Sequence, residues 1–313
     1  MKILHIISNQ LAPLTLAGAI IAFFYPPLFL VFKDIFLWLF AATMFALGLV
    51  LKPEELTDTL RQPKQIAVGL LAQYSLMPGF AFIAASIALY WGLPAEIALG
   101  LIIVGCAPGA MASNVVVYLA GGALAYSIAL TTVATILSPL LTPALVQWLG
   151  GAFLPVAFWP LMKTILLTVV LPLFLGMLLA RSSYKAVDTI RLMAPSVAVL
   201  SIVIICSYAI AANQTRLLSI GPQLLVLVVL VNLAGYAAGW WLAGRFKFDK
   251  RHQIALTIEI GMQNAGLGVA LALKHFSPAT ALPGALFAVW CVLTAAGMSA
   301  WLRRRQKLSA LSR

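Results

Sequence analysis

Long apolar stretches with almost no charge are the feature that most limits what this chain can fold into. Of its 313 residues, 63% are hydrophobic and only 9% are charged, whereas soluble domains carry about 25% charged residues. Such stretches are typical of proteins whose helices cross a lipid bilayer. We therefore expect an all-α integral membrane protein, because helices satisfy every backbone amide internally and these segments are too long and too uniformly apolar for barrel strands.

Charged residues, prolines and glycines divide the chain into ten apolar segments. Each is predicted to be long enough to cross a hydrocarbon core of about 30 Å. The first is interpreted as an uncleaved span and not as a signal peptide, because its basic n-region is weak and a polar Ser-Asn-Gln interrupts its apolar run. The predicted spans are 10–26, 33–51, 65–91, 96–120, 124–149, 157–180, 188–212, 220–244, 251–274 and 280–302.

The lysines and arginines predict the orientation of these spans. With a cytoplasmic N-terminus, 16 of the 20 lie on the cytoplasmic side. The exceptions are Lys33, Lys163, Arg216 and Lys274. Both termini are therefore expected in the cytoplasm. The net charge of +12 indicates membrane topology and not a nucleic-acid-binding surface, because the basic residues form short clusters between apolar segments.

Two polar clusters interrupt apolar segments in matching parts of the chain. They read GAMASN (109–114) and GMQNAG (261–266), and their asparagines, Asn114 and Asn264, are 150 positions apart. Five predicted spans precede the midpoint and five follow it, so repeats over 1–152 and 153–313 would have opposite topology. Inverted repeats with interrupted helices indicate the binding site of a secondary transporter. The alternative is that the small residues only allow tight helix packing.

Glu259 is the one acidic residue well inside a predicted span. A carboxylate in a membrane is costly and usually functional. It could be protonated, pair with a distant basic residue, or neutralise a bound ion. Neighbouring oxygens favour a hard cation, with sodium first and a proton second. The side chains that supply these oxygens are Ser113, Asn114, Thr131, Thr132, Gln263 and Asn264.

The predicted breaks also create helix N-termini near 111–113 and 264–266. Unpaired N–H groups at such ends attract anions, so a cation site beside them indicates cation-coupled uptake of an organic anion. Thr131 and Thr132 could instead hydrogen bond back to a carbonyl one turn earlier. Gln73 could form an interhelical hydrogen bond or reach an ion.

Four motifs together resemble the bile acid:sodium symporter family, bacterial branch, over nearly the whole chain. They are FALGLVLKPEEL (45–56), APGAMASNVVVYLAGG (107–122), EIGMQNAGLG (259–268) and FSPATALPGALFAVW (276–290). The resemblance implies ten helices in two inverted five-helix repeats. Spans 1, 2, 6 and 7 would form a panel domain, and spans 3–5 and 8–10 a core domain in which discontinuous spans 4 and 9 cross.

The resemblance also implies two sodium sites and an organic anion between panel and core, in a bacterial inner membrane. The expected partners are this small anion and the lipid bilayer. No nucleic acid is expected, and no obligate protein partner is inferred. The first sodium site would use Ser113, Asn114, Thr131, Thr132 and Glu259. The second would use Gln73, Glu259, Gln263 and the backbone oxygens of Ile260 and Met262. The anion would lie near Met111, Ala112, Asn264, Ala265, Gly266 and Cys291.

Two positions depart from the family pattern. Met111 stands where many bacterial relatives have threonine, and Cys291-Val292 follows Trp290 where many have His-Asn. Both changes make the expected cleft less polar, so the sequence does not predict which of bile acids, sulfated steroids, pantoate or keto acids is carried.

Three other functions were considered. The nearest is a proton-coupled carrier or exchanger with Glu259 as the proton site. A channel fits a single carboxylate beside mirrored helix breaks less well than a carrier does. A membrane enzyme has little support, because the spans hold neither a His/Asp/Ser constellation nor a second carboxylate. The three cysteines show no paired spacing that would indicate a disulfide or zinc site.

Overall fold

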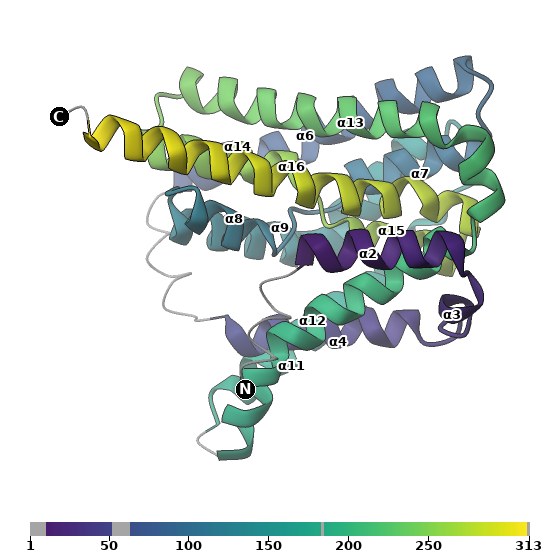
Figure 1. Ribbon diagram of the computed structural model, residues 1–313, viewed down its shortest axis with the longest axis horizontal. Helices are drawn as coiled ribbons and strands as arrows, with labels where there is room; N and C mark the ends of the chain where they lie inside the picture. Colours follow the sequence, from purple (N-terminus) through teal and green to yellow (C-terminus); the bar gives the residue numbers. More distant parts are fainter. Residues whose placement is uncertain (1–10, 52–62, 183–184, 312–313) are drawn as a thin grey trace.

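The computed structural model describes residues 11–51, 63–182 and 185–311, and every regular element in these ranges is a helix. Most of the helices run along one common direction (Figure 1). The prediction of an all-helical chain is confirmed for this part of the protein. The helices of the first half are α2 (Leu11–Phe24), α3 (Pro27–Leu30), α4 (Phe36–Val50), α6 (Pro63–Tyr90), α7 (Ala95–Gly105), α8 (Ser113–Leu119) and α9 (Leu124–Leu145), which continues as the π-helix η1 (Val146–Gly150).

The second half repeats this pattern of long and interrupted helices. Helix α13, with 32 residues, is the longest of the six segments in the described ranges that are long and apolar enough to cross a membrane. The elements are α10 (Phe158–Ile165), the π-helix η2 (Leu166–Val170), α11 (Leu171–Ala180), α12 (Lys185–Ala211), α13 (Gln214–Arg245), α14 (Lys250–Gly261), α15 (Ala265–His275) and α16 (Pro278–Leu311).

Helix lengths correct one expectation from the sequence. Six helices in the described ranges are long and apolar enough to cross a membrane, and three apolar helices are shorter. One of these, α4, has 15 residues, which is about 22 Å at 1.5 Å per residue and less than the hydrocarbon core of about 30 Å. The prediction that every apolar segment is long enough was therefore wrong for α4. Lys52 and Pro53 follow its end, and the residue before a proline disfavours helix.

The predicted boundaries differ most at the ends of α13 and α16. Helix α13 begins at Gln214, although the span was predicted from 220. Helix α16 continues to Leu311, although the span was predicted to end at 302. Arginine, glutamine, lysine and leucine are good helix formers. The apolar pattern marks where the apolar run ends, and these helices extend beyond it.

Close packing through glycine joins the helices into two groups. Helix α4 packs against α11 and α12, and α12 against α2. In the other group, α13 packs against α6 and α14, while α7 and α15 pack against α16. A Cβ atom on Gly176 of α11 would lie 3.0 Å from the Cα of Gly48 in α4. On α13, a Cβ at Gly239 would lie 2.9 Å from the carbonyl oxygen of Leu256 in α14. Small residues at these crossings let the backbones approach, as in other membrane helix pairs.

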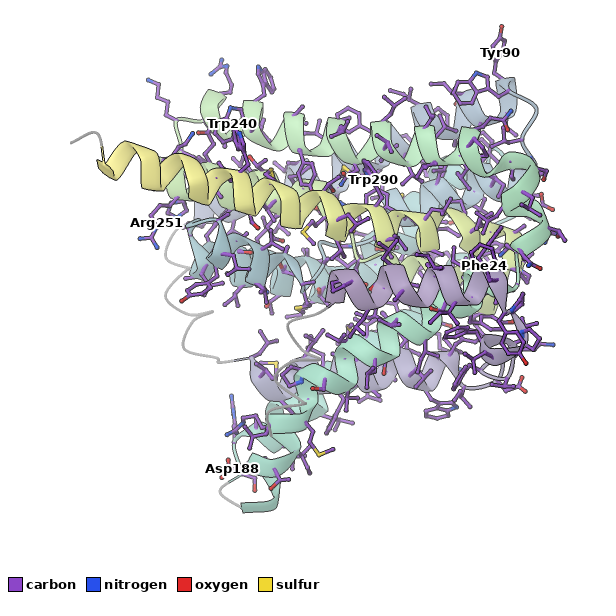
Figure 2. All side chains as sticks on the ribbon, in the orientation of Figure 1. Phe24, Tyr90, Asp188, Trp240, Arg251 and Trp290 are labelled. Atoms are coloured by element: carbon purple, nitrogen blue, oxygen red, sulfur yellow. The ribbon has the colours of Figure 1, made fainter. Side chains whose placement is uncertain are left out.

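The two ends of the helix bundle carry different residues. Figure 2 shows Trp240 and Arg251 at the left end and Phe24 and Tyr90 at the right end. The left end therefore includes the turn between α13 and α14, whose sequence RFKFDKR (245–251) is strongly basic.

Candidate functional site

Two helices are interrupted inside the bundle at the polar clusters found in the sequence. Helix α7 ends at Gly105 and α8 begins at Ser113, while α14 ends at Gly261 and α15 begins at Ala265. Pro108 lies in the first break and has no N–H to donate to a helix. In the second break, Met262 has extended backbone angles, φ −101° and ψ 105°. The predicted interruption of these two helices is confirmed.

The two breaks pair with each other through their backbones. Gly109 and Gln263, the central residues of breaks 106–112 and 262–264, form an antiparallel bridge. The N–H of Ala110 donates to the carbonyl of Met262 at 2.9 Å, and the N–H of Asn264 donates to the carbonyl of Pro108 at 2.8 Å. Backbone groups freed by one break are thus satisfied by the other, which is required inside a membrane.

Side chains from three neighbouring helices satisfy further carbonyls at this crossing. They come from α6, α9 and α13, so the crossing is held from several sides. The bonds are those of the Gln73 amide to Ala107 O (3.0 Å), the Thr142 hydroxyl to Cys106 O (2.8 Å) and the Asn232 amide to Gly261 O (2.8 Å).

Glu259 lies in the last turn of α14, next to the crossing, with 1% of its surface exposed. Its Oε1 accepts hydrogen bonds from the hydroxyls of Ser113 and Ser127. Its Oε2 accepts one from Thr131 at 2.6 Å. A Cβ atom on Gly109 would lie 2.9 Å from Oε2, so glycine lets the first break pass close to the carboxylate.

Among the described residues, Glu259 forms no ion pair. The two ion pairs there are Arg191–Asp188 and His252–Asp249. Pairing with a basic side chain, one of the three fates considered from the sequence, is therefore not observed in this part of the chain. A buried carboxylate that is ionised needs a compensating charge, so protonation or a bound cation remains.

Thr131 and Thr132 have different roles, although they are adjacent in α9. Both hydroxyls bond back to carbonyls one turn earlier, Thr131 to Ser127 at 2.9 Å and Thr132 to Ile128 at 2.7 Å. The one hydrogen of the Thr131 hydroxyl can go either to that carbonyl or to Oε2 of Glu259 at 2.6 Å, whereas the Thr132 hydroxyl has no hydrogen bond to Glu259.

Ser127 is a site residue that was not anticipated from the sequence. It is fully buried, bonds to Glu259, and lies with its Oγ 2.7 Å from Oδ1 of Asn114. The signal was present, because Ser127 and Thr131 are four residues apart and such residues share one face of a helix.

Three residues of the predicted second sodium site, Gln73, Gln263 and Ile260, form one hydrogen-bonded chain. The amide of Gln73 donates to Oε1 of Gln263 at 2.7 Å, and the amide of Gln263 donates to the carbonyl of Ile260 at 2.9 Å. The carbonyl of Met262 accepts from Ala110. The interhelical hydrogen bond considered for Gln73 is therefore present, between α6 and the second break.

Among the predicted substrate residues, Asn264 and Gly266 lie at the N-terminus of α15. The side chain of Asn264 caps this helix by accepting from the N–H of Leu267 at 3.0 Å. A Cβ atom on Gly266 would lie 3.5 Å from Phe40 of α4 and 3.9 Å from Ile202 of α12. This helix end therefore faces the group of helices formed by α4 and α12.

The other predicted substrate residues are placed differently. Ala265 is buried beside Gly266, and Met111 and Ala112 are partly exposed just before the seven-residue helix α8. Cys291 is buried in α16, where its thiol lies 3.6 Å from the carbonyl of Ala288 in the same helix. Cys291 has no direct hydrogen bond to the crossing among the described residues; its carbonyl lies 3.1 Å from the Thr294 hydroxyl, which in turn lies 3.0 Å from Oδ1 of Asn232.

The donor atoms gathered at the crossing are of one chemical kind. Carboxylate, hydroxyl, amide and backbone oxygens converge there, which are the ligands that hard cations prefer. In the ranges that the structure covers, no group of three or more histidine, cysteine, aspartate or glutamate residues could hold a metal ion. The crossing is thus suited to a hard monovalent cation.

Comparison with known proteins agrees with this chemistry. Residues 37–234 match the model of the "Sodium Bile acid symporter family". The chain is 37% identical to the "Uncharacterized sodium-dependent transporter YocS" of Bacillus subtilis over 313 residues, which cover all of this chain and 97% of that protein. It is 32% identical to the "Probable sodium/metabolite cotransporter BASS2, chloroplastic" of Oryza sativa over 97% of this chain and 72% of the relative.

A plant relative of lower coverage points the same way. The chain is 36% identical to the "Probable sodium/metabolite cotransporter BASS1, chloroplastic" of Arabidopsis thaliana over 248 residues, and the match spans 61% of that protein's length. These relatives are named as transporters and not as enzymes. With a family match over more than half of its length, this multi-pass membrane chain belongs to the sodium bile acid symporter family of sodium-dependent transporters.

Proposed function

We propose that the protein imports an organic anion together with sodium by alternating access. The observation that carries this proposal is the buried carboxylate of Glu259, which is surrounded by hydroxyl oxygens and lacks an ion-pair partner in the described residues. The names of the relatives, sodium-dependent transporter and sodium/metabolite cotransporter, support the same coupling ion.

The first sodium ion is proposed to bind between Glu259 and the hydroxyl-bearing residues around it. A hydroxyl group has one hydrogen and two lone pairs, so it can donate to the carboxylate without the ion and turn a lone pair to the ion when it binds. Ser127 replaces Thr132 in this set, because the Thr132 hydroxyl bonds to Ile128 and not to the carboxylate. The proposed ligands are Ser113, Asn114, Ser127, Thr131 and Glu259.

The second sodium ion is proposed to bind on the other side of Glu259, near the second break. Gln263 and Gln73 bring amide oxygens there, and the carbonyls of Ile260 and Met262 belong to the end of α14. Three of these groups now hydrogen bond to one another or to Ala110. An ion at this position would replace part of that network.

The anion is proposed to bind between a panel domain and a core domain. The panel would consist of α2, α4, α10–α11 and α12, and the core of the remaining long helices. Packing of α4 against α11 and α12, and of α12 against α2, supports this panel, whereas α10 packs against α9 of the core. The N-terminus of α15, which faces Phe40 and Ile202 of the panel, would present N–H groups to the anion. Movement of core against panel would then expose the site alternately.

The remaining parts of the proposal follow from the repeat and the charge pattern. Residues 1–152 and 153–313 are the proposed inverted repeats, and pairing of the central residues of the two breaks suits a twofold axis through the crossing. The basic turn after α13 lies at the proposed cytoplasmic end, and the membrane is proposed to be the bacterial inner membrane. The substrate is proposed from the bile-acid-like, pantoate and keto-acid classes.

The test is sodium-dependent uptake by the wild type and Glu259→Gln, with Glu96→Gln as matched control because Glu96 lies in the first turn of α7, away from the crossing. Candidate anions are supplied to membrane vesicles with sodium or choline outside. We expect Glu259→Gln to lose sodium-driven uptake and Glu96→Gln to keep it. Sodium-driven uptake that is unchanged in Glu259→Gln would refute the proposal.

Proton coupling through Glu259 is the alternative, since a buried carboxylate without an ion-pair partner can also carry a proton. A protonophore added at a fixed sodium gradient separates the two. Sodium coupling predicts that uptake continues, whereas proton coupling predicts that it collapses.

A further inference from the structure

An apolar groove lies on the surface of the bundle between α13, α14 and α16, and its inner end, at Tyr236, reaches Gly261 of the crossing. Its volume is about 330 Å³, within the range of small-molecule sites, about 300–1,000 Å³. Trp240 and Trp301 form its rim and are 39% and 51% exposed, whereas Ile254 and Ile258 in its floor are buried. Figure 2 shows that Trp240 lies at the same end of the bundle as Arg251.

The polar groups in this groove are already engaged by the protein. The hydroxyl of Thr257 donates to the carbonyl of Gln253 at 2.8 Å. The hydroxyl of Tyr236 lies 3.4 Å from the hydroxyl of Thr294 and 3.5 Å from the carbonyl of Cys291. A polar solute would therefore find few hydrogen-bond partners in the groove, whereas an aliphatic chain would give up no hydrogen bonds by entering it.

Two basic residues at the start of α14 lie between the groove and the end of the bundle. Lys250 and Arg251 precede Ile254 by four and three residues, so all three lie on one face of α14. The ammonium of Lys250 lies 3.8 Å from the ring centre of Trp240, on the rim of the groove. The carboxylate of this turn, Asp249, is engaged with the backbone of Arg251 and with His252.

We propose that the groove binds one acyl chain of an anionic phospholipid, with Lys250 and Arg251 binding the headgroup phosphate. An exposed apolar groove on a protein of a membrane transporter family is a surface that acyl chains can contact, and basic pockets between membrane helices are known to bind anionic headgroups. Tryptophan at the rim is typical of the interface between headgroups and acyl chains. This site is independent of the sodium ligands at Glu259.

A second groove, which α13 also lines, provides an internal comparison. It lies between α6 and α13, has a volume of about 160 Å³, and is lined only by apolar residues, including Ala234. Neither lining contains a lysine or arginine, but Lys250 stacks on the rim residue Trp240 of the first groove, and no such contact is found at the second among the described residues. It can therefore accept any acyl chain, but it lacks the charge that would select an anionic lipid.

The experiment measures the thermal stability of the full-length protein in detergent at constant NaCl. Phosphatidylglycerol, phosphatidylcholine with the same acyl chains, or glycerol 3-phosphate is added at increasing amounts. We expect phosphatidylglycerol to raise the melting temperature more than phosphatidylcholine does, because a ligand of the native state stabilises it. Glycerol 3-phosphate, which has no acyl chain, is expected to give no shift.

Three variants test the two halves of the site. Lys250→Gln/Arg251→Gln should raise the mole fraction of phosphatidylglycerol needed for half of the shift roughly thirty-fold, from about 1 kcal/mol per basic residue and about 1.4 kcal/mol per tenfold. Ala237→Phe, at an exposed position in the groove, should abolish the preference for phosphatidylglycerol. Ala234→Phe, which fills the second groove, should leave it unchanged.

Two results with the phospholipids would overturn the proposal. One is an equal shift with both phospholipids, which indicates unselective lipid contact. The other is a phosphatidylglycerol preference that survives both Ala237→Phe and the double substitution. A shift with glycerol 3-phosphate alone would likewise reject the acyl-chain part, since the anion would then bind without the groove.

Discussion

Ser127→Ala is the substitution that best separates the site seen in the structure from the site expected from the sequence. The Ser127 hydroxyl bonds to Glu259 and lies 2.7 Å from Oδ1 of Asn114, so it belongs to the oxygen cluster proposed to bind sodium. Thr132, predicted as a ligand from the sequence, has its hydroxyl bonded to Ile128. Thr132→Val, which keeps the shape of the side chain, is the matched control.

The size of the effect follows from the charge of the partner. A hydrogen bond or contact to a charged group contributes about 1.5–3 kcal/mol, so loss of the Ser127 oxygen should weaken sodium binding about 10- to 150-fold at about 1.4 kcal/mol per tenfold. At a sodium concentration of about 100 Kd, the ion stabilises the wild type by about 2.7 kcal/mol. A thirty-fold higher Kd reduces this to about 0.9 kcal/mol at the same concentration.

The assay is the melting temperature of purified protein in NaCl against choline chloride at equal ionic strength. The difference between the two salts is the quantity to compare, because Ser127→Ala also removes a hydrogen bond from the sodium-free protein and lowers stability in both. We expect the difference to shrink about threefold in Ser127→Ala and to stay at the wild-type value in Thr132→Val. The opposite pattern would show that Thr132 is the ligand and that our assignment of Ser127 is wrong.

Three further predictions concern packing, the crossing and pH. Gly176→Ala should destabilise the protein by about 1–3 kcal/mol through overpacking against α4, whereas Gly79→Ala, which has open space around it, should stabilise it by about 0.5–1 kcal/mol; thermal melts measure both. Gln73→Leu should cost about 1–3 kcal/mol in sodium-free buffer, because the Ala107 carbonyl loses its donor inside the protein. Partial burial acts to raise the pKa of Asp249, but hydrogen bonds from His252 and Arg251 outweigh it and lower the pKa below its usual value. The stability from this helix cap should therefore be present at neutral pH and be lost as the pH falls through the lowered pKa. Asp249→Asn should remove this pH dependence.

The sequence was sufficient to predict an all-helical chain and the two interrupted helices. Apolar runs with few charges require helices in a membrane, whatever the tertiary structure. Pro108 and the glycines of the two clusters act locally on the backbone, so the positions of the breaks follow from the residues themselves. The lengths of the helices did not follow in the same way, because α13 and α16 continue through polar residues that the apolar pattern ignores.

The similarity of the two polar clusters, 109–114 and 261–266, predicted equivalent positions for Asn114 and Asn264, and the structure agrees only in part. Asn264 caps α15, but Asn114 lies inside the first turn of α8 and contacts Ser127 instead. The two breaks also differ in length, since one runs over 106–112 and the other over 262–264. A similar sequence pattern predicted similar positions for the two asparagines, but the number of residues in each break decides which of them reaches a helix end.

The sequence by itself determined that Glu259 lies in an apolar segment, where an ionised carboxylate is costly, and that several residues with side-chain oxygens lie near the two helix breaks. Only the tertiary structure decided which of them contact it. Ser127 and Thr131 reach the carboxylate because they share one face of α9 that packs against α14, whereas Thr132 lies about 100° around the same helix and bonds to its own backbone. Contacts between residues more than a hundred positions apart depend on how helices rotate and pack, and that rotation is set by the whole bundle and not by any local stretch of sequence.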